Sequence, residues 1–68
     1  MRDYLILVEL HDSNGNVMAA IHELVTNAKT EEDAVTTACR QVWYRHGGEA
    51  GPFRSDEIVG RVHATLPH

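Results

Sequence analysis

The sequence contains a single cysteine, Cys39, two prolines and no long apolar run. With one cysteine, no disulfide within the chain can stabilise the fold, which favours the reducing cytoplasm over secretion. The apolar run after Met1 to Asp3 is too short to span a bilayer, and no signal-peptide cleavage site follows it. We therefore expect a soluble cytoplasmic protein that does not enter a membrane.

Basic side chains are also few, with six Lys and Arg against ten Asp and Glu and a net charge of −4. Such a field repels a phosphate backbone, so nucleic acid is an unlikely partner on charge alone. The 68 residues are 43% hydrophobic and 24% charged, a composition typical of one small globular domain spanning 1–68. A chain of this size buries little apolar surface, so a protein partner or a second copy would help it.

The most apolar stretch is Tyr4 to Leu10, which has six large apolar or aromatic residues among seven. It contains neither Gly nor Pro, and this predicts a central strand covered on both faces. Asn14-Gly15 follows, a strong hairpin signal because both residues tolerate a positive φ. We expect a second strand over Val17 to Val25.

The turn allows two registers for this hairpin. If Asn14-Gly15 is a two-residue turn, Val8 pairs with Ile21. If Asp12 to Gly15 forms a type I turn with a Gly bulge, Val8 pairs with Ala20 instead. We favour the second register because its outer face collects the polar residues Glu9, His11 and Glu23.

In the favoured register, each face of the hairpin keeps several apolar side chains. The inner face carries Tyr4, Ile6, Val8, Leu10, Met18, Ala20, His22 and Leu24. The outer face carries Leu5, Leu7, Glu9, His11, Val17, Ala19, Ile21 and Glu23. One short helix cannot cover both faces, so Leu5, Leu7, Val17 and Ile21 are expected to form an exposed apolar patch. The alternative is that a small twisted sheet simply leaves some apolar atoms in water.

A helix is predicted from Glu31 to His46, with Thr30 as its cap and Gly47-Gly48 as its stop. Its apolar side is formed by Val35, Ala38, Cys39, Val42 and His46, flanked by Ala34 and Trp43. The segment from Glu49 to Ser55 is expected to be a loop or a short edge segment.

A third strand is predicted over Asp56 to Leu66, whose residues alternate between two faces. One face carries Ile58, Gly60, Val62, Ala64 and Leu66. We predict an α+β fold in which this strand pairs antiparallel with the first, giving an antiparallel three-stranded sheet of spatial order 2-1-3 with one helix packed on it. Parallel pairing beside the second strand is the alternative.

This plan, with a helix opened by the Thr-Glu-Glu-Asp-Ala of Thr30 to Ala34, resembles two groups of small proteins. One is the compact phage-encoded inhibitors of host machinery, including some anti-CRISPR proteins. The other is the antitoxins of the HicB type. The resemblance is one of architecture and size over most of the chain, and it assigns no residue a role.

Few residues point to catalysis or metal binding, and no cofactor is expected. The five histidines, at 11, 22, 46, 63 and 68, form no ligand pair by spacing, although His22 and His63 could meet across strands. Cys39 lies on the apolar side of the helix, which suits a buried thiol rather than a nucleophile. Glu9 and Glu23 could approach each other across the hairpin, but no pocket is evident around them.

The segment Arg40 to His46 combines aromatic and Arg residues, the types that dominate binding hot spots. Arg40, Tyr44 and Arg45 are therefore further candidates for partner binding. Our main hypothesis is a non-enzymatic protein–protein interaction module, in its concrete form a small phage or mobile-element inhibitor of a host protein complex. One alternative is a HicB-like antitoxin or a nucleic-acid-associated regulator that uses Arg40, Tyr44, Arg45, Arg54 and Arg61. A further alternative is a small metal-binding protein or enzyme that uses the histidines or Cys39.

Overall fold

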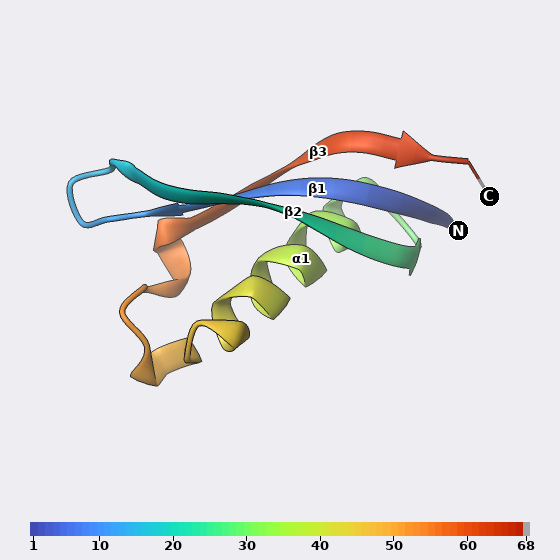
Figure 1. Cartoon of the computed structure of the whole chain (residues 1–68). Helices are drawn as coiled ribbons and strands as arrows, with labels where there is room; N and C mark the ends of the chain where they lie inside the picture. Colours follow the sequence, from blue (N-terminus) through green and yellow to red (C-terminus); the bar gives the residue numbers. More distant parts are fainter. Residues whose placement is uncertain (68) are drawn as a thin grey trace.

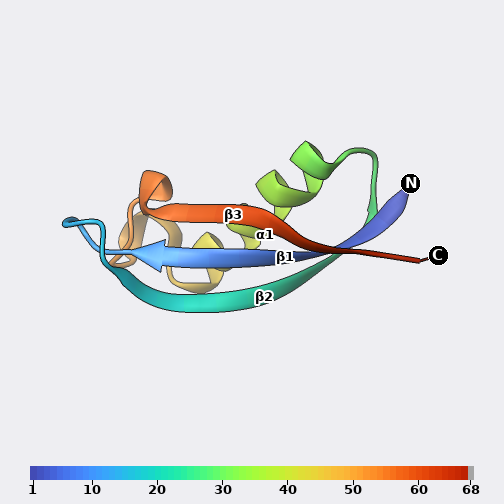
Figure 2. The ribbon, with the colours of Figure 1, turned by 90° about the horizontal axis from the view of Figure 1, so that it is seen from above.

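The computed structural model describes residues 1–67, which form one sheet and one principal helix. The elements are β1 (Arg2–His11), β2 (Val17–Ala28), α1 (Glu31–Arg45) and β3 (Ile58–Leu66). The strands are antiparallel in the order β2-β1-β3, with β1 in the middle (Figure 2). This confirms the predicted α+β fold and the spatial order 2-1-3, and the parallel alternative for β3 is wrong.

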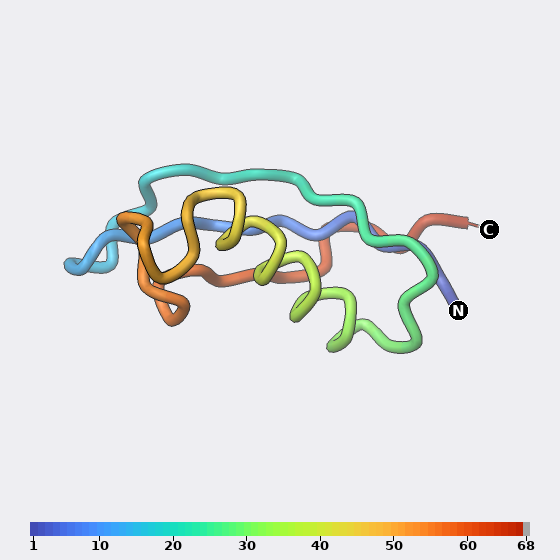
Figure 3. Tube along the Cα trace, turned by 90° about the horizontal axis from the view of Figure 1, so that it is seen from below, coloured from blue at the N-terminus to red at the C-terminus, as the bar shows by residue number. Residues whose placement is uncertain are grey.

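The helix lies on one face of the sheet only. Figure 1 shows α1 on one side of the three strands, and the view from below shows it crossing them obliquely (Figure 3). The segment between α1 and β3 contains two single 3-10 turns, Gly48–Ala50 and Ser55–Glu57, on that same side. The prediction that β1 is covered on both faces is therefore wrong within the described chain.

The core lies between α1 and the sheet. Alternate residues of β1 point toward the helix and are buried, namely Tyr4, Ile6, Val8 and Leu10. They meet Ala34, Ala38 and Val42, which lie one helical turn apart on α1 and are fully buried. Small residues at two of these three positions bring the helix close to the strands. We call this side of the sheet the covered face.

The ends of α1 follow from local chemistry. The backbone N–H of Asp33 donates to the Thr30 hydroxyl oxygen at 3.1 Å, the expected cap. The helix ends at Arg45, and Gly47 has a φ of 99° that a residue with a side chain rarely adopts. His46 was predicted on the apolar side of the helix, but it is the exposed cap residue, and its Nδ1 lies 2.9 Å from the Val42 carbonyl oxygen.

The hairpin register differs from the one we favoured, although the turn itself is the one we favoured. The Gly15 N–H donates to the Asp12 carbonyl, and Gly15 has a φ of 83°, as a type I turn with a Gly bulge requires. A second shift then occurs between the pairs Leu10↔Ala19 and His11↔Val17, leaving Met18 unpaired. Beyond it, Val8 pairs with Ile21.

This second shift exchanges the faces of β2, because side chains alternate along a strand. Ile21 and Glu23 pair with Val8 and Ile6 and lie on the covered face. His22 and Leu24, which were predicted on that face, lie on the opposite one. A single extra residue beside the turn thus reverses the prediction for the whole centre of the strand.

A similar irregularity occurs in β3. The pairs Leu5↔Ala64 and Ile6↔Val62 leave His63 unpaired, so the alternation shifts by one residue at this point. Ile58, Gly60 and Val62 share one face as predicted, and this face meets the helix, opposite Leu10, Val8 and Ile6. Ala64 and Leu66, which were predicted on the same face as these three, lie on the other side.

Candidate protein-interaction surface

The side of the sheet away from α1 has no covering layer among residues 1–67 (Figure 1). We call it the open face. Register places on it Leu5, Leu7, Glu9 and His11 of β1, Val17, Ala20, His22 and Leu24 of β2, and Val59, Arg61, Ala64 and Leu66 of β3. Eight of these twelve side chains are Leu, Val or Ala, so most of the surface is apolar.

Large apolar side chains on the open face are well exposed. Leu24 is 55% exposed and Val59 is 50% exposed, on the two outer strands. Between them, Leu5 and Leu7 on β1 are partly exposed. Apolar side chains therefore occur on all three strands of the open face, with His22 and Arg61 on either side of Leu7 and Glu9 beside Val59.

Polar groups occupy the end of the open face near the hairpin. Glu9 and His11 lie side by side, with His11 Nε2 at 3.3 Å from a Glu9 carboxylate oxygen. Val17 lies opposite His11 across the pair of strands. The open face thus carries polar side chains at this end.

The structure places three of the four predicted patch residues on the open face, namely Leu5, Leu7 and Val17. Ile21 is the exception, because it packs against the core on the covered face. Leu24 and Val59 were not predicted, although both are more exposed than Leu7. The alternating pattern of β3 in the sequence already placed Val59 on the face opposite Ile58 and Val62. The position of Leu24 could not be predicted from the sequence, because it depends on the register shift at Met18.

Glu23 was expected on a polar face with Glu9 and His11, and this was wrong. It is 8% exposed on the covered face, where both of its carboxylate oxygens accept hydrogen bonds from the Arg45 guanidinium at 2.8 Å. These hydrogen bonds and the negative charge raise the pKa of Arg45 above its ordinary value. Arg45, a predicted partner-binding residue, therefore ties the end of α1 to β2.

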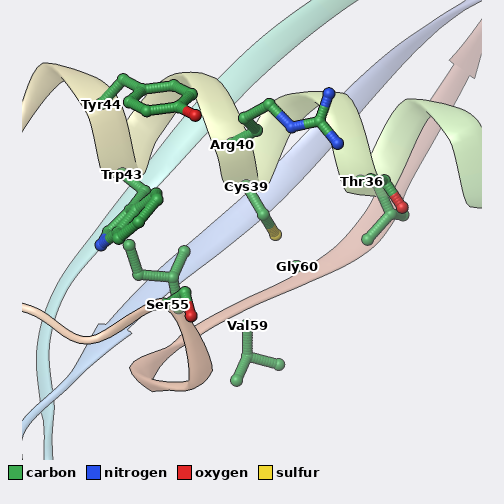
Figure 4. A pocket seen from close by; sticks show the side chains of 10 residues that line it. Thr36, Cys39, Arg40, Trp43, Tyr44, Ser55, Val59 and Gly60 are labelled. Carbon is green, nitrogen blue, oxygen red and sulfur yellow. The ribbon is translucent and has the colours of Figure 1, made fainter. Parts of the chain in front are cut away.

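Arg40 and Tyr44 lie beside a groove between α1 and the free edge of β3 (Figure 4). Its apolar lining includes Val35, Trp43 and Ile58, and Arg40 is the only charged side chain among the residues that line it. Tyr44 is 64% exposed and its ring lies against that of Trp43. The Trp43 indole N–H donates to the Phe53 carbonyl at 2.9 Å, which holds the loop against the helix.

The four arginines proposed for nucleic-acid contact, Arg40, Arg45, Arg54 and Arg61, do not form one surface. Arg45 is paired with Glu23, and Arg54 lies 3.1 Å from Asp56. Arg40 lies on the helix, whereas Arg61 lies on the open face. Two of these four charges are thus matched by a carboxylate within the chain, which weakens their attraction for phosphate.

The groups considered for catalysis lie apart. Glu9 and Glu23 are on opposite faces of the sheet, so the predicted approach of these two carboxylates does not occur. Burial raises the pKa of the Cys39 thiol, which lowers its thiolate fraction. The Cys39 sulfur points toward Gly60 (Figure 4), where a Cβ added to Gly60 would lie 2.7 Å from it. Cys39 therefore packs at the closest approach of helix and sheet.

Within residues 1–67, no three His, Cys, Asp or Glu side chains gather as metal ligands would. Among the same residues, no helix is long and apolar enough to cross a bilayer. Comparisons with protein families, with curated proteins and with solved structures give no match to this chain.

Proposed function

We propose that this protein is a non-enzymatic protein–protein interaction module that binds a partner protein through its open face. The observation that supports the proposal is the set of exposed apolar side chains on the open face, chiefly Leu24 and Val59, with Leu5 and Leu7 partly exposed between them. Burying a whole leucine side chain contributes roughly 1.5–3 kcal/mol, so covering the exposed half of Leu24 contributes about 1 kcal/mol. Several such side chains supply the centre of a binding site.

The charge of the chain favours a foreign partner over a second copy. At a net charge of −4, two copies repel each other, whereas a partner with basic residues around an apolar centre is attracted. On the open face itself, Glu9 offers one acidic contact and Arg61 one basic contact, so the attraction to a basic partner comes from the net charge of the chain. We therefore propose that the open face binds a protein whose contact surface has apolar residues at its centre and basic residues around them.

The partner must also reach beyond the sheet face. Three strands of about nine residues present an area of about 14 Å by 30 Å, or roughly 400 Å². A stable interface buries about 800 Å² on each partner. The free edges of β2 and β3 border the open face and offer unpaired backbone groups for strand addition.

An inhibitor from a phage or mobile element, directed at a host protein complex, is the concrete form of the proposal. A small acidic protein that covers a basic functional surface of a larger protein blocks it by occupancy alone. The expected location of such an inhibitor is the host cytoplasm.

The test is affinity capture from lysate of the source organism, with and without nuclease, followed by mass spectrometry. It compares the wild-type chain with Leu24→Asp and with Tyr44→Asp, which places the same charge on the helix side. We expect a partner whose capture survives nuclease treatment. The Tyr44→Asp chain should still capture this partner, and the Leu24→Asp chain should not. Equal capture by all three chains would overturn the proposal, and self-association lost in Leu24→Asp would assign the open face to a second copy.

A further inference from the structure

Two histidines meet on the open face although they belong to strands that are not neighbours. His22 of β2 lies opposite Leu7, and His63 is the residue that the shift in β3 leaves unpaired. With β1 between them, the backbones of β2 and β3 are about 9–10 Å apart. The two imidazole rings nevertheless have centroids only 4.6 Å apart and are tilted by 55°. Both side chains therefore lean inward over the central strand.

This spacing is close to the spacing that a shared metal ion requires. Zinc binds imidazole nitrogen at about 2.0–2.1 Å with tetrahedral angles, which places the centroids of two ligating rings about 5 Å apart. The centroids of the His22 and His63 rings, 4.6 Å apart, lie within about 1 Å of that value.

Neither imidazole is committed elsewhere among residues 1–67. His22 and His63 form no hydrogen bond or ion pair with another described side chain, whereas His11 contacts Glu9 and His46 contacts the Val42 carbonyl. Both rings are exposed, so an ion can reach them from solvent. Arg61, on the same face of β3, is the nearby positive charge that opposes cation binding.

We propose that His22 and His63 bind one divalent transition-metal ion of the class that prefers imidazole ligands, such as zinc. The chain supplies two ligands, and water fills the remaining positions in the free protein. This inference rests on the proposed function in one respect: the protein that covers the open face replaces water with a ligand of its own. The ion would then join the two proteins at the centre of their interface.

The experiment is a titration of the full chain with Zn²⁺ near neutral pH, followed by NMR of the histidine side chains. We expect one ion per chain and shifts of the His22 and His63 resonances. His22→Ala and His63→Ala should each weaken binding at least about tenfold, since even indirect support of a metal ligand is worth that much. His11→Ala, on the same face, is the matched control and should bind as the wild type does.

Absence of any shift at millimolar Zn²⁺, or equal loss of binding in His11→Ala, would overturn the metal site. The titration uses the ion alone, so a negative result would not affect the proposal that the open face binds a partner protein. Conversely, equal capture by wild type and Leu24→Asp would overturn the proposed function while leaving ion binding as measured. Repeating the capture with a chelator should release the partner from the wild-type chain, and unchanged capture would contradict the bridging role.

Discussion

The two faces of β1 carry side chains of similar size, yet one is buried and the other is exposed. Ile6 and Val8 point toward α1 and are fully buried, whereas Leu5 and Leu7 alternate with them and remain partly in water. The difference comes from what lies opposite each face, because residues 1–67 contain a single α-helix for two largely apolar faces. Apolar residues on a central strand therefore mark both the core of this protein and the surface that we assign to binding.

The largest expected effect separates these two faces directly. Ile6→Ala removes a fully buried side chain from the covered face and should lower the free energy of unfolding by about 2–5 kcal/mol. Leu7→Ala, on the next residue of the same strand, should cost less than about 1 kcal/mol. Chemical denaturation measures both, and equal losses would show that the open face also holds the fold together.

A second prediction concerns the closest approach on the covered face. Gly60→Ala adds a Cβ that would lie 2.7 Å from the Cys39 sulfur and 3.2 Å from Val35 Cγ1. Such overpacking should destabilise the chain by about 1–3 kcal/mol. Cys39→Ala in the same chain removes the sulfur and should restore part of the loss. If the two substitutions simply add, the clash does not limit the approach of helix and sheet.

The sequence predicted the element order, the sheet order and the helix cap, because these depend on local signals such as Thr30 and Asn14-Gly15. It did not predict the register, although the turn was correct. The unpaired Met18 shifts the strand pairing beyond the turn by one residue, and no local sequence propensity marks this shift. Glu23 shows the consequence, since an acidic residue in an apolar strand looks solvent-facing until its partner Arg45 is placed.

The pair of Glu23 and Arg45 provides a third, smaller comparison on the covered face. Arg45→Ala leaves a carboxylate buried without its cation, so it should clearly lower the midpoint of thermal unfolding. Glu23→Leu replaces the charge with an apolar side chain and frees a half-exposed Arg45, so it should change stability by no more than about 0.5 kcal/mol. The opposite order of effects would mean that Arg45 does not serve to neutralise Glu23.

The smallest expected effect lies at the hairpin end, away from the core. Hydrogen bonds from Asn16 hold the pKa of Asp12 below its usual value. The ionised form is thus favoured by folding, and Asp12 stabilises the chain above its usual pKa and loses this contribution as the pH falls through the lowered value. The stability difference between wild type and Asp12→Ala should be constant near pH 6 and shrink below about pH 4. A gap independent of pH would contradict this.

The most direct test of the account measures stability and binding on the same samples of Leu24→Asp. If the open face serves binding and not folding, the free energy of unfolding should stay within about 0.5 kcal/mol of the wild type. Affinity for the captured partner should fall at least about tenfold, which corresponds to about 1.4 kcal/mol. Unchanged affinity, or a loss of stability as large as that of Ile6→Ala, would contradict the division of the sheet into a folding face and a binding face.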